Sequence, residues 1–194
     1  AIVADRTCHP RYVAADILSQ AEHGMDSQSI LFTDSEQVAH DVLRELEVQL
    51  ESLPRKEMAM ASLRNSRIVV LRDMEEAFGI CNEYAPEHLI LAMDSALEWT
   101  DRVVNAGSVF LGHYSCESAG DYASGTNHTL PTSGYAKAYS GVNLDSFCRK
   151  ITFQHLTPQG IQSIGRAVEV MAEAESLDAH RNAMTLRMQD LQED

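Results

Sequence analysis

The sequence is short of positive charge. Lysine and arginine together number 15, against 29 aspartate and glutamate residues, so the formal net charge is -14 at pH 7. The basic residues form no cluster along the chain that would make a local exception. Such a chain would be repelled by the phosphates of nucleic acids and by anionic membranes. We therefore expect neither a nucleic-acid partner nor a membrane partner.

Paired cysteines and long apolar runs are also missing. The four cysteines form no CxxC pair, which argues against a cysteine-rich zinc site. No segment resembles a signal peptide, and no run of 18 apolar residues is present. These absences predict a soluble, cytoplasmic protein. The first residue is alanine, and the chain opens directly on the strand-like run 1–4, so we expect a fragment of a longer protein.

Short apolar runs alternate with segments whose apolar residues recur at helical spacing. The apolar runs predict strands over 1–5, 29–33, 67–71, 88–92 and 108–111. The segments between them predict helices, one from Pro10 to a stop at Gly24 and others over 38–50, 55–65, 74–84 and 97–104. Strands that alternate with helices indicate βαβ units. The predicted fold is α/β, with an incomplete Rossmann-like, mostly parallel sheet and helices on both faces.

The pattern changes after Gly141. The sequence predicts a helical turn over 144–148, a strand over 151–155, a long helix from Pro158 and a second helix over 178–191. We therefore expect an α/β domain over residues 1–142 and a small helical C-terminal arm over residues 143–194. An arm too thin to enclose its own core is expected to dock on its own domain or on a neighbouring subunit.

A polar, glycine-rich stretch occupies residues 117–135, ESAGDYASGTNHTLPTSGY. It has too little apolar surface to fill a core, and its glycines allow a ligand to approach the main chain closely. Long irregular loops are usually functional or disordered, and Tyr122 and Pro131 argue against disorder. We predict a functional loop in which Asp121 and His128 carry the chemistry, although Asp121 alone could be an ordinary turn residue.

Two further pairs of residues could carry chemistry. Gln20 and His23 are three apart near the end of a predicted helix, so they share one face and could reach one metal ion. An exposed polar helix end is the alternative interpretation. Glu87 and His88 could serve as general base and general acid, or could be an exposed pair at the start of a strand. Since strand residues alternate in direction, the bend at Pro86 must break that alternation if both act together.

Several long motifs resemble one enzyme family, in the same order along the chain. They are LSQAEHG at 18–24, YAPEHL at 84–89, AGSVFLG at 106–112, ESAGDYASGTNHTLPTSGYA at 117–136 and AEAESLDAHRNAMTLR at 172–187. Over about residues 1–188, the chain resembles the C-terminal part of histidinol dehydrogenase. The resemblance implies a zinc- and NAD-dependent oxidation of L-histidinol to L-histidine in two steps, within histidine biosynthesis. It also implies that a further part of the enzyme precedes Ala1.

The resemblance implies roles for single residues. It gives a zinc site made by Gln20, His23, Asp121 and His180, a nitrogen and oxygen set that suits zinc. The other subunit of a homodimer would donate His180 through an exchanged C-terminal arm; by itself, His180 could be an ordinary surface histidine. His88 would take the alcohol proton, and Glu87 would activate the water that adds to the aldehyde intermediate. The implied substrate-binding set is Gln20, His23, His88, Asp121, His128, Glu175 and His180, in which Glu175 pairs with the substrate ammonium.

The residues that bind NAD stay unknown at this point. No Gly-rich dinucleotide fingerprint is present, and the resemblance places the NAD contacts before Ala1. We therefore expect the chain alone to be inactive. Cys116 and His113 depart from residues common in the family, but neither belongs to the ligand set. Two alternatives stay open: a non-catalytic zinc- or ligand-binding truncated paralogue, and a related amino-alcohol dehydrogenase.

Overall fold

A computed structural model describes residues 1–193, and its first compact unit, Ala1–Phe147, is built on a five-stranded sheet. The strands are β1 (Ile2–Ala4), β2 (Ile30–Thr33), β3 (Arg67–Val70), β4 (His88–Ala92) and β5 (Ser108–Leu111). They lie in the order β3-β2-β1-β4-β5, and every pairing is parallel. This is the strand order of a Rossmann sheet without its sixth strand. The predicted fold class is confirmed.

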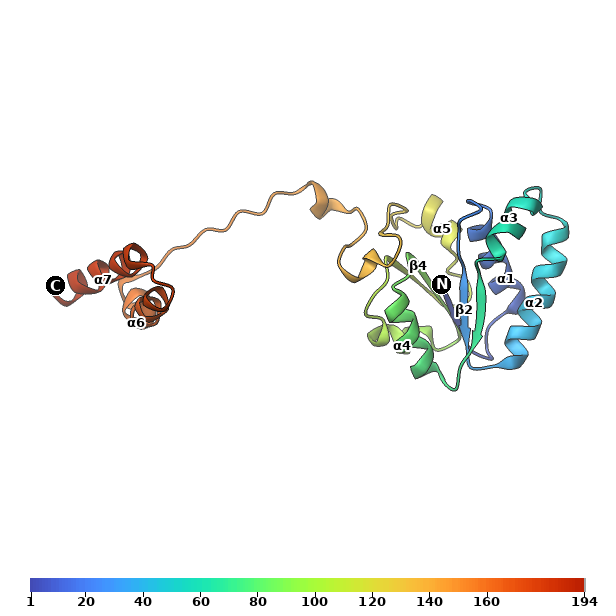
Figure 1. Ribbon diagram of the computed structural model, residues 1–194, viewed down its shortest axis with the longest axis horizontal. Coiled ribbons are helices and arrows are strands. Elements are labelled where there is room, and N and C mark those ends of the chain that lie inside the picture. The colour runs from blue at the N-terminus through green and yellow to red at the C-terminus, as the bar shows by residue number, and fades with distance from the viewer. Residues whose placement is uncertain (194) are drawn as a thin grey trace. The chain divides into compact units, whose positions relative to one another are not determined.

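Helices cover both faces of this sheet (Figure 1). One face carries α1 (Pro10–Ala21), α2 (Glu36–Glu51) and α3 (Lys56–Leu63), and the other carries α4 (Met74–Tyr84) and the 3-10 helix η1 (Ala96–Arg102). Local chemistry fixes where the helices begin: Pro10 occupies the first turn of α1. Side-chain oxygens of Ser35 and Asp73 accept hydrogen bonds from the main chain of α2 and α4.

The core lies between the sheet and these two helical layers. Alternate residues of each strand enter opposite layers, so the strands are apolar on both sides, as central strands of a parallel sheet must be. Val3, Phe32 and Leu91 pack toward α4. Ile2, Leu31 and Ile90 pack toward α1 and α2.

Short helices follow the last strand of the first unit. They are α5 (Glu117–Tyr122) and the 3-10 helices η2 (Tyr135–Lys137) and η3 (Leu144–Phe147). The first unit ends at Phe147, a little beyond the boundary expected after residue 142.

The second unit, Cys148–Asp194, contains two helices, α6 (Pro158–Ala174) and α7 (Asp178–Glu193), which pack against each other. Gly165 lies directly against Met188, where a larger residue would collide with the sulfur. The turn between the helices is closed by two hydrogen bonds, from Leu177 N to Ala172 O (2.8 Å) and from Ser176 N to Glu173 O (2.9 Å). This is the Schellman arrangement, with Ser176 in the left-handed conformation at φ 59 that glycine more often adopts.

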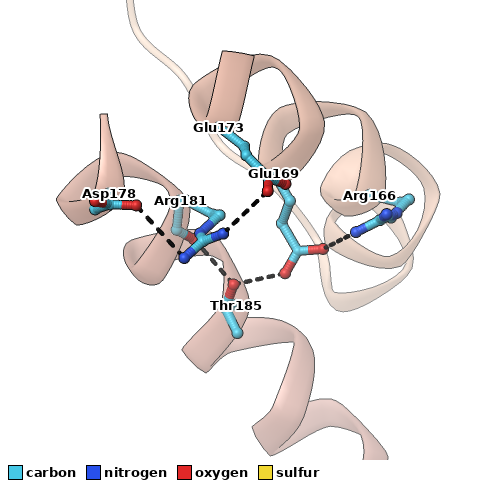
Figure 2. A network of polar contacts seen from close by, with 6 residues as sticks. All are labelled: Arg166, Glu169, Glu173, Asp178, Arg181 and Thr185. Carbon is cyan, nitrogen blue, oxygen red and sulfur yellow. Dashed lines mark hydrogen bonds and ion pairs between the residues drawn. The ribbon is translucent and has the colours of Figure 1, made fainter. Parts of the chain in front are cut away.

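Polar side chains join the facing sides of α6 and α7 (Figure 2). The Thr185 hydroxyl donates to Glu169 at 2.6 Å. Arg181 forms ion pairs with Glu173 (3.6 Å) and Asp178 (3.4 Å). Exposed ion pairs contribute little stability each.

The prediction of a strand over 151–155 is wrong. Residues 148–157 form no helix or strand, and the rest of the described second unit is helical apart from the turn between α6 and α7. A strand needs a neighbour to accept and donate its main-chain hydrogen bonds. The alternating sequence therefore finds no pairing partner within its own unit.

The expected end of the first helix is also wrong. The last residue of α1 is Ala21, and Glu22 closes the helix in an ordinary right-handed conformation, so Gly24 takes no part in the cap. No helix within residues 1–193 has the length and apolar character needed to cross a membrane.

Candidate active site

A cavity of about 560 Å³ lies beyond the amino ends of the strands in the first unit. His88 is the first residue of β4, Ser27 precedes β2, and Gln20 belongs to the last turn of α1. Doubly wound sheets usually bind ligands at the opposite edge, beyond the carboxyl ends of their strands. The cavity is lined by Gln20, His23, Ser27, Glu87, His88, Glu117, Asp121, Tyr122 and His128.

The end of α1 supplies Gln20 and His23. His23 lies just beyond the helix, and its main-chain N–H donates to the Gln20 carbonyl at 3.2 Å. The two residues therefore do not share a helix face as predicted. A tight turn brings both of them to the cavity instead.

The turn after α4 supplies Glu87 and His88. Ala85 ends α4 in the left-handed conformation at φ 52, and Pro86 follows. Glu87 stands before the regular strand, and its carbonyl accepts from Ser108 N at 2.9 Å. Only His88 belongs to β4, so the alternation of side chains along a strand does not apply to Glu87. Both side chains therefore line the same cavity. Burial raises the pKa of Glu87 and lowers the pKa of His88 to about 4.

The helix α5 supplies two carboxylates, where the sequence predicted an irregular loop from residue 117. Glu117 and Asp121 are four residues apart and lie on one face of this helix. Gly120 makes the packing possible, since a Cβ there would stand 2.6 Å from the ring of Phe110. The loop prediction was wrong for residues 117–122, because contact with Phe110 orders a segment whose composition favours no helix.

Glu117 is the residue that sequence reasoning missed. It is 2% exposed, and its Oε1 lies 3.7 Å from His88 Nδ1 and 3.9 Å from His23 Nε2. Burial, and then the charge of Asp121, raise the pKa of Glu117 to about 7. The spacing of four between Glu117 and Asp121 was the available signal, and only a helical interpretation of the stretch would have used it.

The donor atoms around the cavity fit a metal ion. His23, Glu117 and Asp121 each offer one ligand atom, and these atoms lie within 4.8 Å of one another. Within the described chain, three buried atoms of the cavity have no hydrogen-bond partner: Gln20 Nε2, His88 Nε2 and Glu117 Oε2. Buried polar atoms are nearly always paired. Their clustering here indicates a place that a bound ion or ligand completes.

The first unit alone forms the cavity and brings together six predicted residues: Gln20, His23, Glu87, His88, Asp121 and His128. The other two, Glu175 and His180, belong to the second unit. Glu175 caps the end of α6, and His180 lies in the first turn of α7. Glu175 and His180 thus lie on the two sides of the turn between the two helices.

Substituting Gly107 by alanine is expected to disturb the turn that carries Glu87. The new Cβ would stand 2.5 Å from the Glu87 carbonyl oxygen and 3.2 Å from Pro131. The main chain must then move, at a cost of about 1–3 kcal/mol of unfolding free energy. Urea denaturation measures this cost. The matched control is Gly79→Ala within α4, where nothing lies within 4 Å. It should be neutral or stabilising by up to about 1 kcal/mol, and equal stability of the two variants would contradict the prediction.

Fold and cavity together define a class. This is a Rossmann-like α/β domain, with an adjacent carboxylate and imidazole beside nitrogen and oxygen side chains of the kind that bind a divalent metal. Comparison with known proteins then identifies the family. The chain belongs to the histidinol dehydrogenase family, which matches residues 1–188.

Individual relatives agree with this assignment. The chain is 59% identical over 190 residues to histidinol dehydrogenase of Bacteroides thetaiotaomicron, covering 98% of this chain and 44% of the relative. It is 52% identical over 192 residues to the chloroplastic enzyme of Oryza sativa, covering 98% of this chain and 41% of the relative. The crystal structure of histidinol dehydrogenase from Elizabethkingia anophelis matches with a TM-score of 0.91 and 56% identity, covering 98% of this chain and 44% of that one. The chain thus spans less than half the length of these relatives.

Proposed function

We propose that this chain supplies the zinc- and substrate-binding part of a histidinol dehydrogenase, which oxidises L-histidinol to L-histidine with NAD as the oxidant. The proposal rests on one observation: six predicted residues line one cavity in a chain of this family. The three unpaired buried atoms at the same place support a ligand site rather than a packed polar cluster.

The proposed zinc ligands are Gln20, His23 and Asp121 from the first unit and His180 from α7. Imidazole and carboxylate ligands are those that zinc commonly takes, and the glutamine would be a weaker ligand. Bound zinc would supply positive charge that holds and polarises the substrate. Glu175 would hold the substrate ammonium, and His128, at the rim of the cavity, would contact the substrate.

The proposed proton transfers use the pair at the start of β4. Since burial holds the pKa of His88 near 4, its imidazole is neutral at pH 7 and can accept the proton of the substrate alcohol. Glu87 would take a proton from the water that adds to the aldehyde. Its raised pKa makes the carboxylate a stronger base than an exposed glutamate.

No residue of this chain is assigned to NAD. The segment between β1 and α1, where a Rossmann domain holds the pyrophosphate, is Asp5–His9 and contains no glycine. It therefore does not fit the usual glycine-rich cradle, and the chain alone is expected to reduce little or no NAD.

The stoichiometry of the reaction tests the proposed function. Conversion of an alcohol to a carboxylate releases two hydrides, so a complete enzyme that contains this chain should form two NADH for each L-histidinol consumed. Absorbance of NADH and chromatography of the product measure the ratio. Preference for an amino alcohol without an imidazole would favour a related dehydrogenase. Zinc binding without any turnover would favour the non-catalytic paralogue.

We also propose a homodimer with an exchanged arm, because residues 143–194 are too few to enclose a core and carry His180 and Glu175. A mixture of His23→Ala and His180→Ala chains, unfolded and refolded together, tests this arrangement. With exchange, a mixed dimer holds one site with both lesions and one intact site, so zinc binding partly returns. With an arm folded back on its own chain, every site keeps a lesion. Mixed dimers without any recovery of zinc binding would contradict the exchange.

A further inference from the structure

We propose that Glu117 is the positioning residue of His88. Its carboxylate holds the Nδ1–H of the imidazole, and this leaves Nε2 as the atom that takes the substrate proton. The inference rests on the proposed role of His88 in proton transfer. It assigns a role to Glu117, which the proposed proton transfers do not use.

The geometry joins Glu117 to His88 rather than to solvent. The Glu117 side chain is 3% exposed and that of His88 is 11% exposed, with 3.7 Å between Oε1 and Nδ1. This distance is about 0.5 Å beyond the range of an N–H···O hydrogen bond, so the bond forms only when one of the two side chains moves toward the other. Hydrogen bonds at catalytic groups are commonly long without substrate and shorten when it binds.

The two nitrogens of His88 have different surroundings. Nδ1 faces Glu117, whereas Nε2 is buried in the cavity wall and has no partner within residues 1–193. In a neutral imidazole one nitrogen donates and the other accepts, and the partner of the first decides which is which. A carboxylate at Nδ1 therefore places the lone pair on Nε2, the nitrogen that has no partner in the described structure. The same carboxylate stabilises the imidazolium after Nε2 has taken the proton.

One aromatic ring holds both members of the pair in place. Phe110 of β5 lies 6.0 Å from the His88 ring, between centroids, and Gly120 packs α5 directly onto the same ring. His88 and the helix that carries Glu117 thus both pack against the buried side chain of Phe110. Precise placement of this kind is what a reacting imidazole requires.

A role as a zinc ligand is the rival interpretation of Glu117, because its Oε1 also lies 3.9 Å from His23 Nε2. Exposure separates the two roles. The His23 side chain is 62% exposed, so the ligand group formed with Asp121 opens toward solvent, whereas Glu117 is buried deeper, beside His88. Asp121 from the same helix face already offers a carboxylate.

Nitrogen NMR of the histidine rings tests the proposal without any need for activity. In the zinc-free chain labelled with ¹⁵N-histidine, His88 should carry its proton on Nδ1. In Glu117→Leu, where no acceptor remains, the proton should move toward Nε2, the position that free imidazole side chains prefer. In Glu117→Gln the amide oxygen can still accept from Nδ1–H, so this variant removes the charge and keeps an acceptor. His88→Asn assigns the signal. Glu83→Gln is the control: it removes the charge of an exposed carboxylate that pairs with Lys137 at 3.0 Å, and should leave the tautomer unchanged.

Two further measurements separate positioning from metal binding. With cobalt in place of zinc, the visible spectrum of Glu117→Gln should match that of the unsubstituted chain, because the ligand set is the same. In a complete enzyme, Glu117→Gln should lower kcat by about 10–100-fold with KM changed less than about threefold. An Nε2–H tautomer in the unsubstituted chain would overturn the proposal, and so would a changed cobalt spectrum with an unchanged tautomer. An inactive complete enzyme whose His88 keeps the Nδ1–H tautomer would instead count against the proposed function.

Discussion

Replacing His88 by asparagine is expected to lower kcat by about 10²–10⁴-fold in a complete enzyme that contains this chain. The asparagine keeps a polar side chain at the start of β4 but cannot accept the alcohol proton. KM should change much less, because proton transfer belongs to the transition state rather than to substrate binding. Steady-state formation of NADH with L-histidinol measures both constants.

The control for this variant is His113→Asn. His113 is buried to nearly the same degree as His88, with 12% of its side chain exposed, but it pairs with Asp94 at 2.9 Å and does not line the cavity. Its loss should leave kcat within about threefold of the unsubstituted enzyme. Similar losses of kcat in both variants would mean that a buried histidine supports the fold rather than the reaction.

Glu87→Gln distinguishes the two members of the pair. If Glu87 activates the water that adds to the aldehyde, this variant should still carry out the first oxidation and stall before the second. Rapid mixing should then show one NADH per site, followed by a rate reduced by about 10²–10⁴-fold. Loss of the first NADH as well would contradict the division of roles between Glu87 and His88.

The second large effect is expected at the metal. The unsubstituted protein, purified without chelator, should contain about one zinc per chain, and His23→Ala should weaken zinc binding at least about tenfold, which is about 1.4 kcal/mol. Few side chains would hold the ion, and the glutamine among them is a weak ligand. Loss of the His23 imidazole should therefore lower the zinc affinity clearly. Competition with a chromophoric chelator measures the affinity.

His40→Ala is the matched control for the metal experiment. His40 is an exposed histidine on α2 and does not line the cavity, so its loss removes one imidazole without touching the proposed site. Zinc affinity should stay at the level of the unsubstituted protein. An absence of zinc binding under excess metal at neutral pH, or an equal loss in both variants, would show that the ligand assignment is wrong.

Much of the fold could be predicted from the sequence, because periodicity reports which faces are buried. The helix predicted over 74–84 has the same bounds in the structure, and all five strands of the sheet fall within the predicted runs. Six candidate residues, which were singled out through motifs that resemble the family rather than through spacing, line one cavity, and their roles stay predictions. Prediction failed at 151–155, because a strand depends on a partner that periodicity cannot report.

The sequence by itself determined the parallel α/β sheet, the helical arm and the family, since each follows from local patterns or from continuous motifs. Tertiary structure alone decided that the site lies at the amino edge of the sheet, where the ends of α1, α4 and α5 meet. It also decided that residues 117–122 form a helix, since Gly120 lets that segment pack on Phe110. Glu117 faces His88 for the same reason: long-range packing, rather than local propensity, orders the segment that carries it.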